Sequence, residues 1–224
     1  MPNQLAFDLP AKPALGREDF FVSPANANAV AMVEAWNTWP NRKLALVGPS
    51  GAGKTHLAHV WAELASARIV SATALPQLDI PELASRNIAL EDVAMIAGNP
   101  QAETALFHLH NLTLAQNHSL LITADLAPAR WGLTLPDLKS RMESTTSVII
   151  ESPDDTLLAA LMVKLFTDRQ LSPTPETIPF LIRHIDRSFD MARRVVSALD
   201  DAALSQGREI NRKLAGDVLD GMRG

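Results

Sequence analysis

Residues 48–55 constrain the fold of this chain more than any other stretch. They read Gly-Pro-Ser-Gly-Ala-Gly-Lys-Thr, so that Gly48, Gly53, Lys54 and Thr55 occupy the fixed positions of G-x-x-x-x-G-K-[ST], the phosphate-binding loop. An apolar run precedes the loop and an amphipathic stretch follows it. Strand, loop and helix are therefore present in the order that the motif requires, which predicts a nucleotide-binding α/β domain.

The residue types in this loop suit phosphate binding. Glycines let the backbone turn sharply and bring successive N–H groups close to phosphate oxygens, which a Cβ would obstruct. The helix that begins near Gly53 directs its positive end at the anion. Lys54 supplies an ammonium group for the β- and γ-phosphates, and the Thr55 hydroxyl is placed to bind Mg²⁺. The predicted nucleotide-binding residues here are Gly48, Pro49, Ser50, Gly51, Ala52, Gly53, Lys54, Thr55 and His56.

Five short apolar runs alternate with stretches of helical periodicity in the first part of the chain. The expected strands are residues 43–47, 68–72, 87–90, 120–123 and 147–150. The expected helices are residues 25–39, 53–64 and 100–116, with a loop and a poor helix at residues 74–85. Alternation of this kind predicts a five-stranded parallel sheet covered by helices on both faces.

The pattern changes after Pro153, where helical periodicity continues without strands. Helices are expected there at residues 154–170, 174–184, 189–205 and 208–222. Residues 1–16 contain three prolines and no apolar period, and predict an extended tail. We therefore expect an α/β base over residues 17–152, followed by a small all-α lid over residues 153–224.

The composition excludes several classes of protein. The chain has no cysteine, which excludes a disulfide framework and a cysteine-based metal site and favours a reducing cytoplasm. No run of 18 apolar residues occurs, so no membrane span is expected. The formal net charge of -5 argues against general electrostatic attraction to nucleic acid.

Acidic residues follow two of the expected strands. Glu91 and Asp92 follow one, and Asp125 follows another; ligands of open α/β sheets gather at such strand ends. One carboxylate can hold Mg²⁺ through water while its neighbour orients an attacking water. Two simpler interpretations remain open: a pair of acids that begins a surface loop, and an aspartate that caps a helix.

Two arginines are candidates for phosphate recognition. Arg141 precedes the last expected strand, and Arg193 lies in a helix of the expected lid. A guanidinium group donates bidentate hydrogen bonds and stays charged, which suits phosphate. Most arginines are simply solvated, so spacing alone leaves both roles open.

The order of these motifs resembles the AAA+ ATPase domain of the DnaA family, over about residues 17–222. The resemblance implies an AAA+ fold that binds ADP or ATP with Mg²⁺. Residues 20–22 and Asn26 resemble the segment that closes over the adenine, which implies nucleotide contacts by Phe21, Val22 and Asn26. Residues 91–98 resemble the Walker B stretch and its tail.

The same resemblance assigns roles to single polar residues. It implies that Thr55, and Glu91 through water, hold Mg²⁺. It also implies that Asp125 is sensor 1, Arg141 the arginine finger and Arg193 the sensor 2 arginine.

The chain departs from the family pattern at two positions. Glu91 stands where aspartate is usual, and the extra methylene displaces the carboxylate, so weak intrinsic ATPase activity at most is expected. Asp137 stands where DnaA tends to have a further arginine, which puts any interaction through that charge in doubt.

The tail contains Gln4-Leu5-Ala6-Phe7-Asp8-Leu9. This segment resembles the peptide by which bacterial replication proteins dock on the sliding clamp, the β subunit of DNA polymerase III, with Gln4, Leu5, Phe7 and Leu9 as anchors. An apolar strip folded back on the domain is the alternative.

The sequence ends at Gly224, and we expect no helix-turn-helix domain to follow. Together with the tail, this resembles DnaA-related regulators that dock on the clamp and promote hydrolysis of DnaA-bound ATP. The implied partners are the clamp and DnaA, with DNA contacted only through the clamp. The implied location is the cytoplasm, with nucleoid association through the clamp; self-association stays open.

Three other functions stay open. The first is an autonomous AAA+ ATPase or helicase loader, which turnover by the purified protein alone would favour. The second is a metabolite kinase, for which no separate substrate cluster is visible. The third is a DNA-binding adaptor, against which the acidic charge balance argues.

Overall fold

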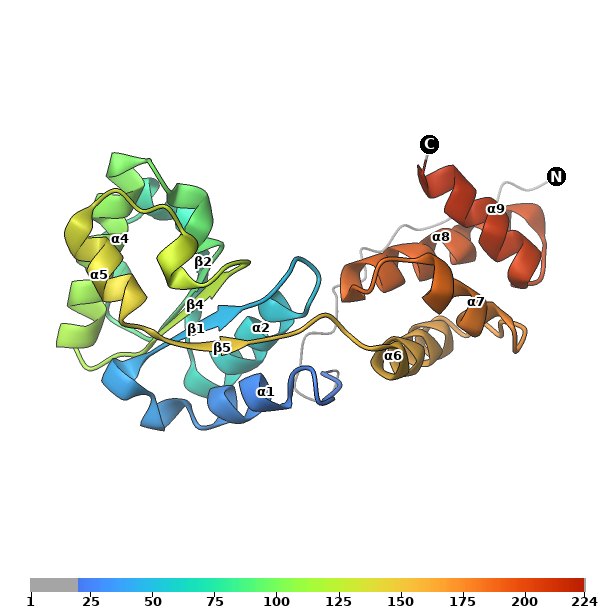
Figure 1. The fold of residues 1–224 in the computed structure, drawn as a ribbon, viewed down its shortest axis with the longest axis horizontal. Helices are drawn as coiled ribbons and strands as arrows, with labels where there is room; N and C mark the ends of the chain where they lie inside the picture. Colours follow the sequence, from blue (N-terminus) through green and yellow to red (C-terminus); the bar gives the residue numbers. More distant parts are fainter. Residues whose placement is uncertain (1–19, 224) are drawn as a thin grey trace, which may run out of the picture.

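A computed structural model describes residues 20–223 of the chain, with the backbone alone at Arg223. The described residues form two parts joined by an extended segment after β5 (Figure 1). We call residues 20–150 the base and residues 155–223 the lid. The predicted clamp peptide, residues 4–9, lies outside the described residues.

The base contains one sheet of five parallel strands in the order β2-β3-β4-β1-β5. The strands are β1 Lys43–Val47, β2 Arg68–Ser71, β3 Ile88–Glu91, β4 Leu120–Ala124 and β5 Thr146–Ile149. Every residue of β1 and β4 is buried, which explains their continuous apolar runs, because parallel strands are covered on both faces. The predicted five-stranded parallel α/β fold is confirmed.

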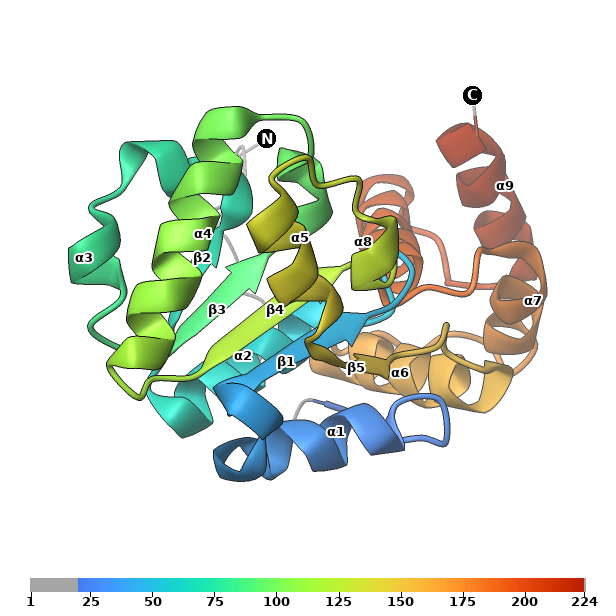
Figure 2. The same ribbon diagram turned by 60° about the vertical axis from the view of Figure 1, so that its left-hand side comes forward.

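Helices cover both faces of this sheet (Figure 2). On one face α1 (Ala27–Glu34) and α2 (Lys54–Ala65) pack on Leu44, Leu46 and Leu121. On the other face α3 (Ile80–Leu83), α4 (Pro100–Ala115) and α5 (Pro136–Glu143) pack on Leu90 and Ile122. Each face has its own core because side chains alternate along a strand.

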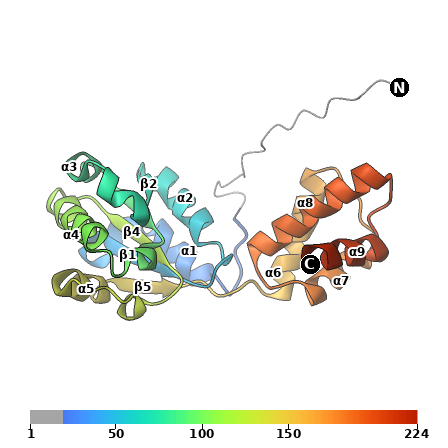
Figure 3. The ribbon, with the colours of Figure 1, turned by 90° about the horizontal axis from the view of Figure 1, so that it is seen from above.

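The lid lies beside the base (Figure 3); it consists of four helices with a core of their own. They are α6 Asp155–Asp168, α7 Thr177–His184, α8 Phe189–Gln206 and α9 Arg212–Arg223. The Asp154 side chain caps α6 by accepting a hydrogen bond from the Leu157 N–H, and Ser188 caps α8 through the Met191 N–H. None of the helices within residues 20–223 is long and apolar enough to span a bilayer.

Two helical expectations differ from the structure. The helix expected over residues 25–39 ends at Glu34, and 3₁₀ turns follow. There Trp36 and Trp39 turn toward Trp61, with ring centroids 6.4 Å and 5.2 Å away, so tertiary packing ends the helix. Helix α5 was not expected as a helix, because only Leu138 and Met142 in it are buried and its remaining residues are mainly polar.

Candidate nucleotide site and arginine-bearing helix

The phosphate-binding loop joins β1 to α2 at the carboxyl edge of the sheet. Gly51 and Gly53 have φ angles of +73° and +100°, in the left-handed region that favours glycine. A Cβ at Gly48 would lie 2.3 Å from the Ile150 carbonyl oxygen. All three glycines are therefore required by the backbone itself.

Lys54 is the first residue of α2 and is 8% exposed. Its ammonium nitrogen donates to the carbonyl oxygens of Gly48 at 2.7 Å and Pro49 at 3.0 Å, and to Asp125 Oδ1 at 2.7 Å. These contacts account for the three protons of the ammonium group. A phosphate that binds Lys54 must therefore replace or share one of them, and Asp125 is the exposed partner.

A cleft of about 520 Å³ opens over the loop. Two cations line it, Lys54 and Arg193, together with three carboxylates, those of Asp92, Asp125 and Asp190. The remaining lining residues are Ser50, Gly51, Gly53, Thr55, His56 and Phe189. Base and lid therefore form this cleft together, and its volume is in the range of small-molecule sites.

The two acidic residues after β3 lie differently. Asp92 lines the cleft; its φ is 58°, and its N–H donates to Thr123 Oγ1 at 3.2 Å. Glu91 is not among the lining residues. Its Oε1 is buried and accepts no hydrogen bond from residues 20–223.

The oxygen atoms at the cleft fit Mg²⁺. Thr55 contributes a hydroxyl and Asp92 a carboxylate, and Mg²⁺ prefers oxygen ligands. In the described part of the chain, no three acidic or histidine side chains form a metal-binding group. A Mg²⁺ ion here would therefore depend on nucleotide phosphates and water for its other ligands.

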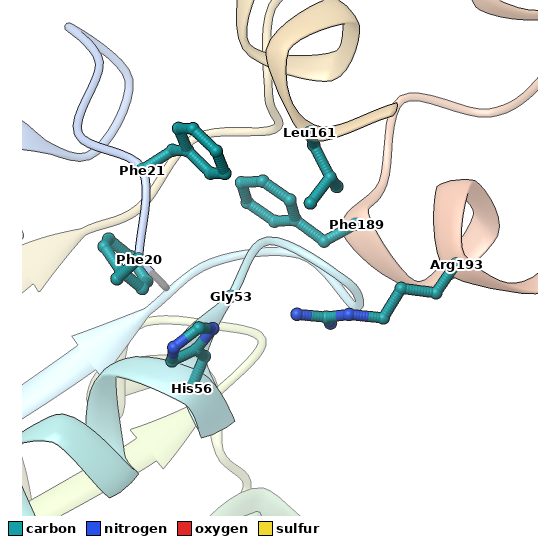
Figure 4. Close-up of a pocket in the computed structure, with 7 residues that line it drawn as sticks. All are labelled: Phe20, Phe21, Gly53, His56, Leu161, Phe189 and Arg193. Carbon is teal, nitrogen blue, oxygen red and sulfur yellow. The ribbon is translucent and has the colours of Figure 1, made fainter. Parts of the chain in front are cut away.

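A second, smaller cavity lies between the base and the lid (Figure 4). Its volume is about 20 Å³, room for one water molecule and far too little for a purine. Its lining residues are Phe20, Phe21, Gly53, His56, Leu161, Phe189 and Arg193. An adenine ring at this place would require Phe189 or the whole lid to move.

Of the four residues matched to the adenine segment, Phe20 and Phe21 line this cavity. Val22 is 49% exposed and is not among the lining residues. Asn26 is buried; its amide group donates to the Phe21 carbonyl at 2.8 Å and its Oδ1 accepts from the Ser23 N–H at 2.9 Å. Asn26 therefore fixes the turn that carries Phe21.

The start of α8 lies directly on the phosphate-binding loop. The Phe189 N–H donates to the Gly51 carbonyl at 2.9 Å, and a Cβ at Gly51 would lie 2.6 Å from Ser188 Cβ. Arg193, one turn further along α8, lines both cavities. Burial lowers the pKa of its guanidinium, and the neighbouring Asp190 carboxylate opposes that shift.

Arg141 lies elsewhere, on α5. Helix α5 lies at the end of the base farther from the lid (Figures 1 and 3). It is exposed, and its guanidinium carbon lies 5.3 Å from the centroid of the Phe107 ring. Lys43 Nζ donates to the Arg141 carbonyl at 2.6 Å. Burial, and secondly the charge of Arg141, lower the pKa of Lys43. Arg141 is not among the residues that line the cleft.

Several residues of the site were not predicted from the sequence. Leu161, Phe189 and Asp190 line one or both cavities, and all three come from the lid. No local pattern marks them, because only the folding of the lid onto the base brings them to the loop.

Comparisons with known proteins define the class of fold. No family model matches the sequence. An uncharacterized protein of Haemophilus influenzae is 28% identical over 177 residues, which cover 73% of this chain and 75% of that protein. Domain III of the Thermotoga maritima replication initiation protein DnaA is similar with a TM-score of 0.80 at 20% identity, covering 95% of this chain and 98% of that one.

AMPPCP-bound DnaA from Aquifex aeolicus is similar with a TM-score of 0.73 at 18% identity, covering 87% of this chain and 67% of that one. Likeness at these identities defines the fold. The chain has the α/β fold of these DnaA structures, with a parallel five-stranded base and a helical lid.

Proposed function

We propose that this chain is a nucleotide-binding regulator of replication initiation that resembles Hda. In this proposal Gln4, Leu5, Phe7 and Leu9 dock on the sliding clamp, and Arg141 completes the hydrolysis site of ATP bound to DnaA. Its effect is to repress re-initiation. The DnaA-like fold supports a role beside DnaA, because related AAA+ domains can share an interface.

The position of Arg141 is the observation that carries this proposal. The side chain is exposed on α5 and does not line the cleft of its own chain. A guanidinium in that position can reach a nucleotide only on another molecule. Arginine fingers supplied in trans accelerate hydrolysis by about 10³- to 10⁵-fold in the systems where they have been measured.

The cleft of this chain holds ADP or ATP in the proposal. AMPPCP-bound DnaA, with its similar fold, supports an adenine nucleotide. The loop N–H groups and Lys54 bind the phosphates, and Arg193 contacts them from the lid. Mg²⁺ on Thr55, and through water on Asp92, Asp125 or Glu91, would neutralise phosphate charge. The nucleotide then sets the position of the lid, because α8 contacts the loop directly.

A reconstitution tests the proposal. DnaA is loaded with labelled ATP and mixed with clamp-loaded DNA, with and without this protein. Hydrolysis should accelerate only when clamp, DNA and this protein are all present. Equal hydrolysis with and without the protein would exclude the proposal.

The docking segment has its own test. Replacing Gln4, Leu5 and Phe7 together by alanine should abolish co-elution with the clamp and leave the melting temperature unchanged, because the segment precedes in sequence the described residues that form the three cores. A synthetic peptide of residues 1–16, added as a competitor, should likewise displace the wild-type protein from the clamp. Undiminished clamp binding by the variant would remove the clamp from the proposal.

An autonomous ATPase is the second candidate. The observation in its favour is that Thr55, Asp92, Asp125 and Arg193 all line the cleft of the chain itself. Steady-state turnover by the purified protein, with neither clamp nor DnaA present, would favour this candidate. Turnover far slower than the stimulated hydrolysis on DnaA favours the regulator.

A further inference from the structure

Glu103 is a buried carboxylate that does not line the cleft over the phosphate-binding loop. It lies in the first turn of α4 and is 0% exposed. The Gly98 N–H donates to Oε1 at 2.8 Å, and the Leu135 N–H donates to Oε2 at 2.7 Å. The Thr134 N–H and hydroxyl also donate to Oε2, each at 3.0 Å. Buried charge of this kind persists only where donors satisfy it.

The pKa of Glu103 reflects this environment. Burial by itself raises the pKa, but the N–H groups of Leu135, Thr134 and Gly98, together with the Thr134 hydroxyl, outweigh it and hold the pKa below its ordinary value. The group is therefore a carboxylate at neutral pH, and as a carboxylate it can only accept hydrogen bonds.

The donors belong to two segments that both begin at the cleft. One segment runs from Asp92 through a 3₁₀ turn to Gly98. The other runs from Asp125 to Thr134 and Leu135. Asp92 and Asp125 line the cleft, so each segment joins a cleft carboxylate to the same buried side chain.

The second segment leads directly into α5. Leu135 is the N-cap residue of α5, and Arg141 lies in its last turn. Four residues after Glu103, Phe107 presents the ring that lies under the Arg141 guanidinium, because residues at i and i+4 share a helix face. Helix α4 therefore holds both the start of α5 and the side chain of Arg141.

We propose that Glu103 is a positioning residue that couples the nucleotide state of the cleft to the orientation of Arg141. The inference rests on the proposed function of Arg141. A phosphate that takes the place of Asp125 at Lys54, or a phosphate-bound Mg²⁺ that binds Asp92, shifts the start of a segment whose other end Glu103 holds. Because four donors fix the carboxylate, the shift reaches α5 instead of being absorbed in the loops.

Amide hydrogen exchange of the full chain tests this coupling without DnaA. Glu103→Gln keeps the shape of the side chain but turns an NH₂ donor toward N–H donors. Glu143→Gln, an exposed change on α5 itself, is the matched control. Exchange is measured with and without ADP and Mg²⁺, and again with ATP and Mg²⁺.

In all three proteins nucleotide should slow exchange at residues 48–56. In the wild type and Glu143→Gln it should also change exchange at residues 134–143, by about fivefold or more. In Glu103→Gln the response at residues 134–143 should disappear. A wild type without that response, or a Glu103→Gln variant that keeps it, would overturn the inference.

A milder variant covers the case in which Glu103→Gln does not fold. Thr134→Val removes the hydroxyl donor and leaves the three backbone donors in place. The nucleotide response at residues 134–143 should fall by about half. An unchanged response in Thr134→Val would also contradict the coupling role of Glu103.

The rate of stimulated ATP hydrolysis on DnaA shows whether Glu103 positions Arg141 or only stabilises the fold. Glu103→Gln should lower the maximal rate of hydrolysis on DnaA about tenfold, while the half-saturating protein concentration stays within about threefold. A purely structural defect would raise the half-saturating concentration instead. If the wild type itself fails to stimulate, the proposed function is wrong, and the exchange result still decides the coupling.

Discussion

Arg193 and Arg141 place the same chemical group in opposite surroundings. Arg193 is half-buried in the lid, shares the cleft with Lys54 and Asp190, and has a pKa lowered by burial. Arg141 is exposed on α5, lies over the Phe107 ring, and does not line the cleft. One guanidinium therefore faces the cleft over the phosphate-binding loop of its own chain, and the other is exposed outside that cleft.

In the proposed function, this difference separates nucleotide binding by the chain from its action on DnaA. A desolvated arginine beside a phosphate loop contributes to affinity, since charge-assisted hydrogen bonds strengthen where water is excluded. An exposed arginine contributes nothing to that affinity and remains available to another molecule. Substitutions at the two places should consequently change different measurements.

The largest effect is expected at Arg141. Arg141→Ala should lower the stimulated hydrolysis of DnaA-bound ATP by about 1,000-fold, because it removes the charge that stabilises the transition state. Nucleotide affinity of the chain itself should stay within about threefold. Lys139→Ala, another exposed cation on α5, is the control and should stimulate normally. Full stimulation by Arg141→Ala would assign the finger to another residue.

Substitution of Lys54 should give the next largest effect, on the nucleotide affinity of the chain's own cleft. Lys54→Ala removes the ammonium group that the loop carbonyls and Asp125 surround, and should weaken nucleotide binding about 100-fold. Titration with a fluorescent ADP or ATP analogue measures it, with the exposed Lys213→Ala as control. Unchanged affinity would mean that the cleft is not the nucleotide site.

A smaller effect is expected at Gly53. Alanine there must adopt a φ of +100°, and its Cβ would lie 3.3 Å from the Phe189 ring. Gly53→Ala should therefore weaken nucleotide binding about tenfold and lower the melting temperature. Gly221→Ala, where nothing lies within 4 Å, is the control. Equal affinity in both variants would remove the requirement for glycine in the loop.

The smallest effect concerns the pH dependence of stability. Burial lowers the pKa of His110 to about 4, with opposition from Asn111 and minor contributions from Lys43 and Arg141. The pKa of a histidine in the unfolded chain is about 6.5. At pH values between that pKa and the folded-state pKa, the unfolded chain therefore binds more protons than the folded chain. Stability therefore falls as pH falls through that window.

Lowering the pH from about 7 to about 5.5 should cost roughly 1 kcal/mol of unfolding free energy through this group. Denaturant unfolding at both pH values measures the change. His110→Gln should reduce the pH dependence by that amount, whereas the exposed His108→Gln should not. The same pH dependence in all three proteins would show that His110 is not the titrating group.

The sequence predicted those parts of the fold whose signal is local. The expected runs match all five strands to within one or two residues, because each is a short apolar run bounded by polar residues. The phosphate loop could be predicted for a related reason: residues 48–55 contain its glycines together with Lys54 and Thr55. Helix α5 carries too few apolar residues to show a helical period.

The parts that the sequence did not predict depend on segments far apart in the chain. Phe189 and Asp190 reach the loop only because the lid packs on the base. The hydrogen bonds of Glu103 to residues 98, 134 and 135 likewise follow from tertiary packing. Asn26 was predicted to contact nucleotide, and in the structure its side chain stabilises the turn beside Phe21.

One paired measurement tests the division between the two arginines most directly. Wild type, Arg141→Ala and Arg193→Ala are each titrated with nucleotide and then assayed, at saturating nucleotide, for hydrolysis of ATP on DnaA. Arg193→Ala should bind nucleotide about tenfold more weakly and still stimulate. Arg141→Ala should bind normally and fail to stimulate. Loss of nucleotide affinity in Arg141→Ala, or stimulation retained by it, would contradict the account.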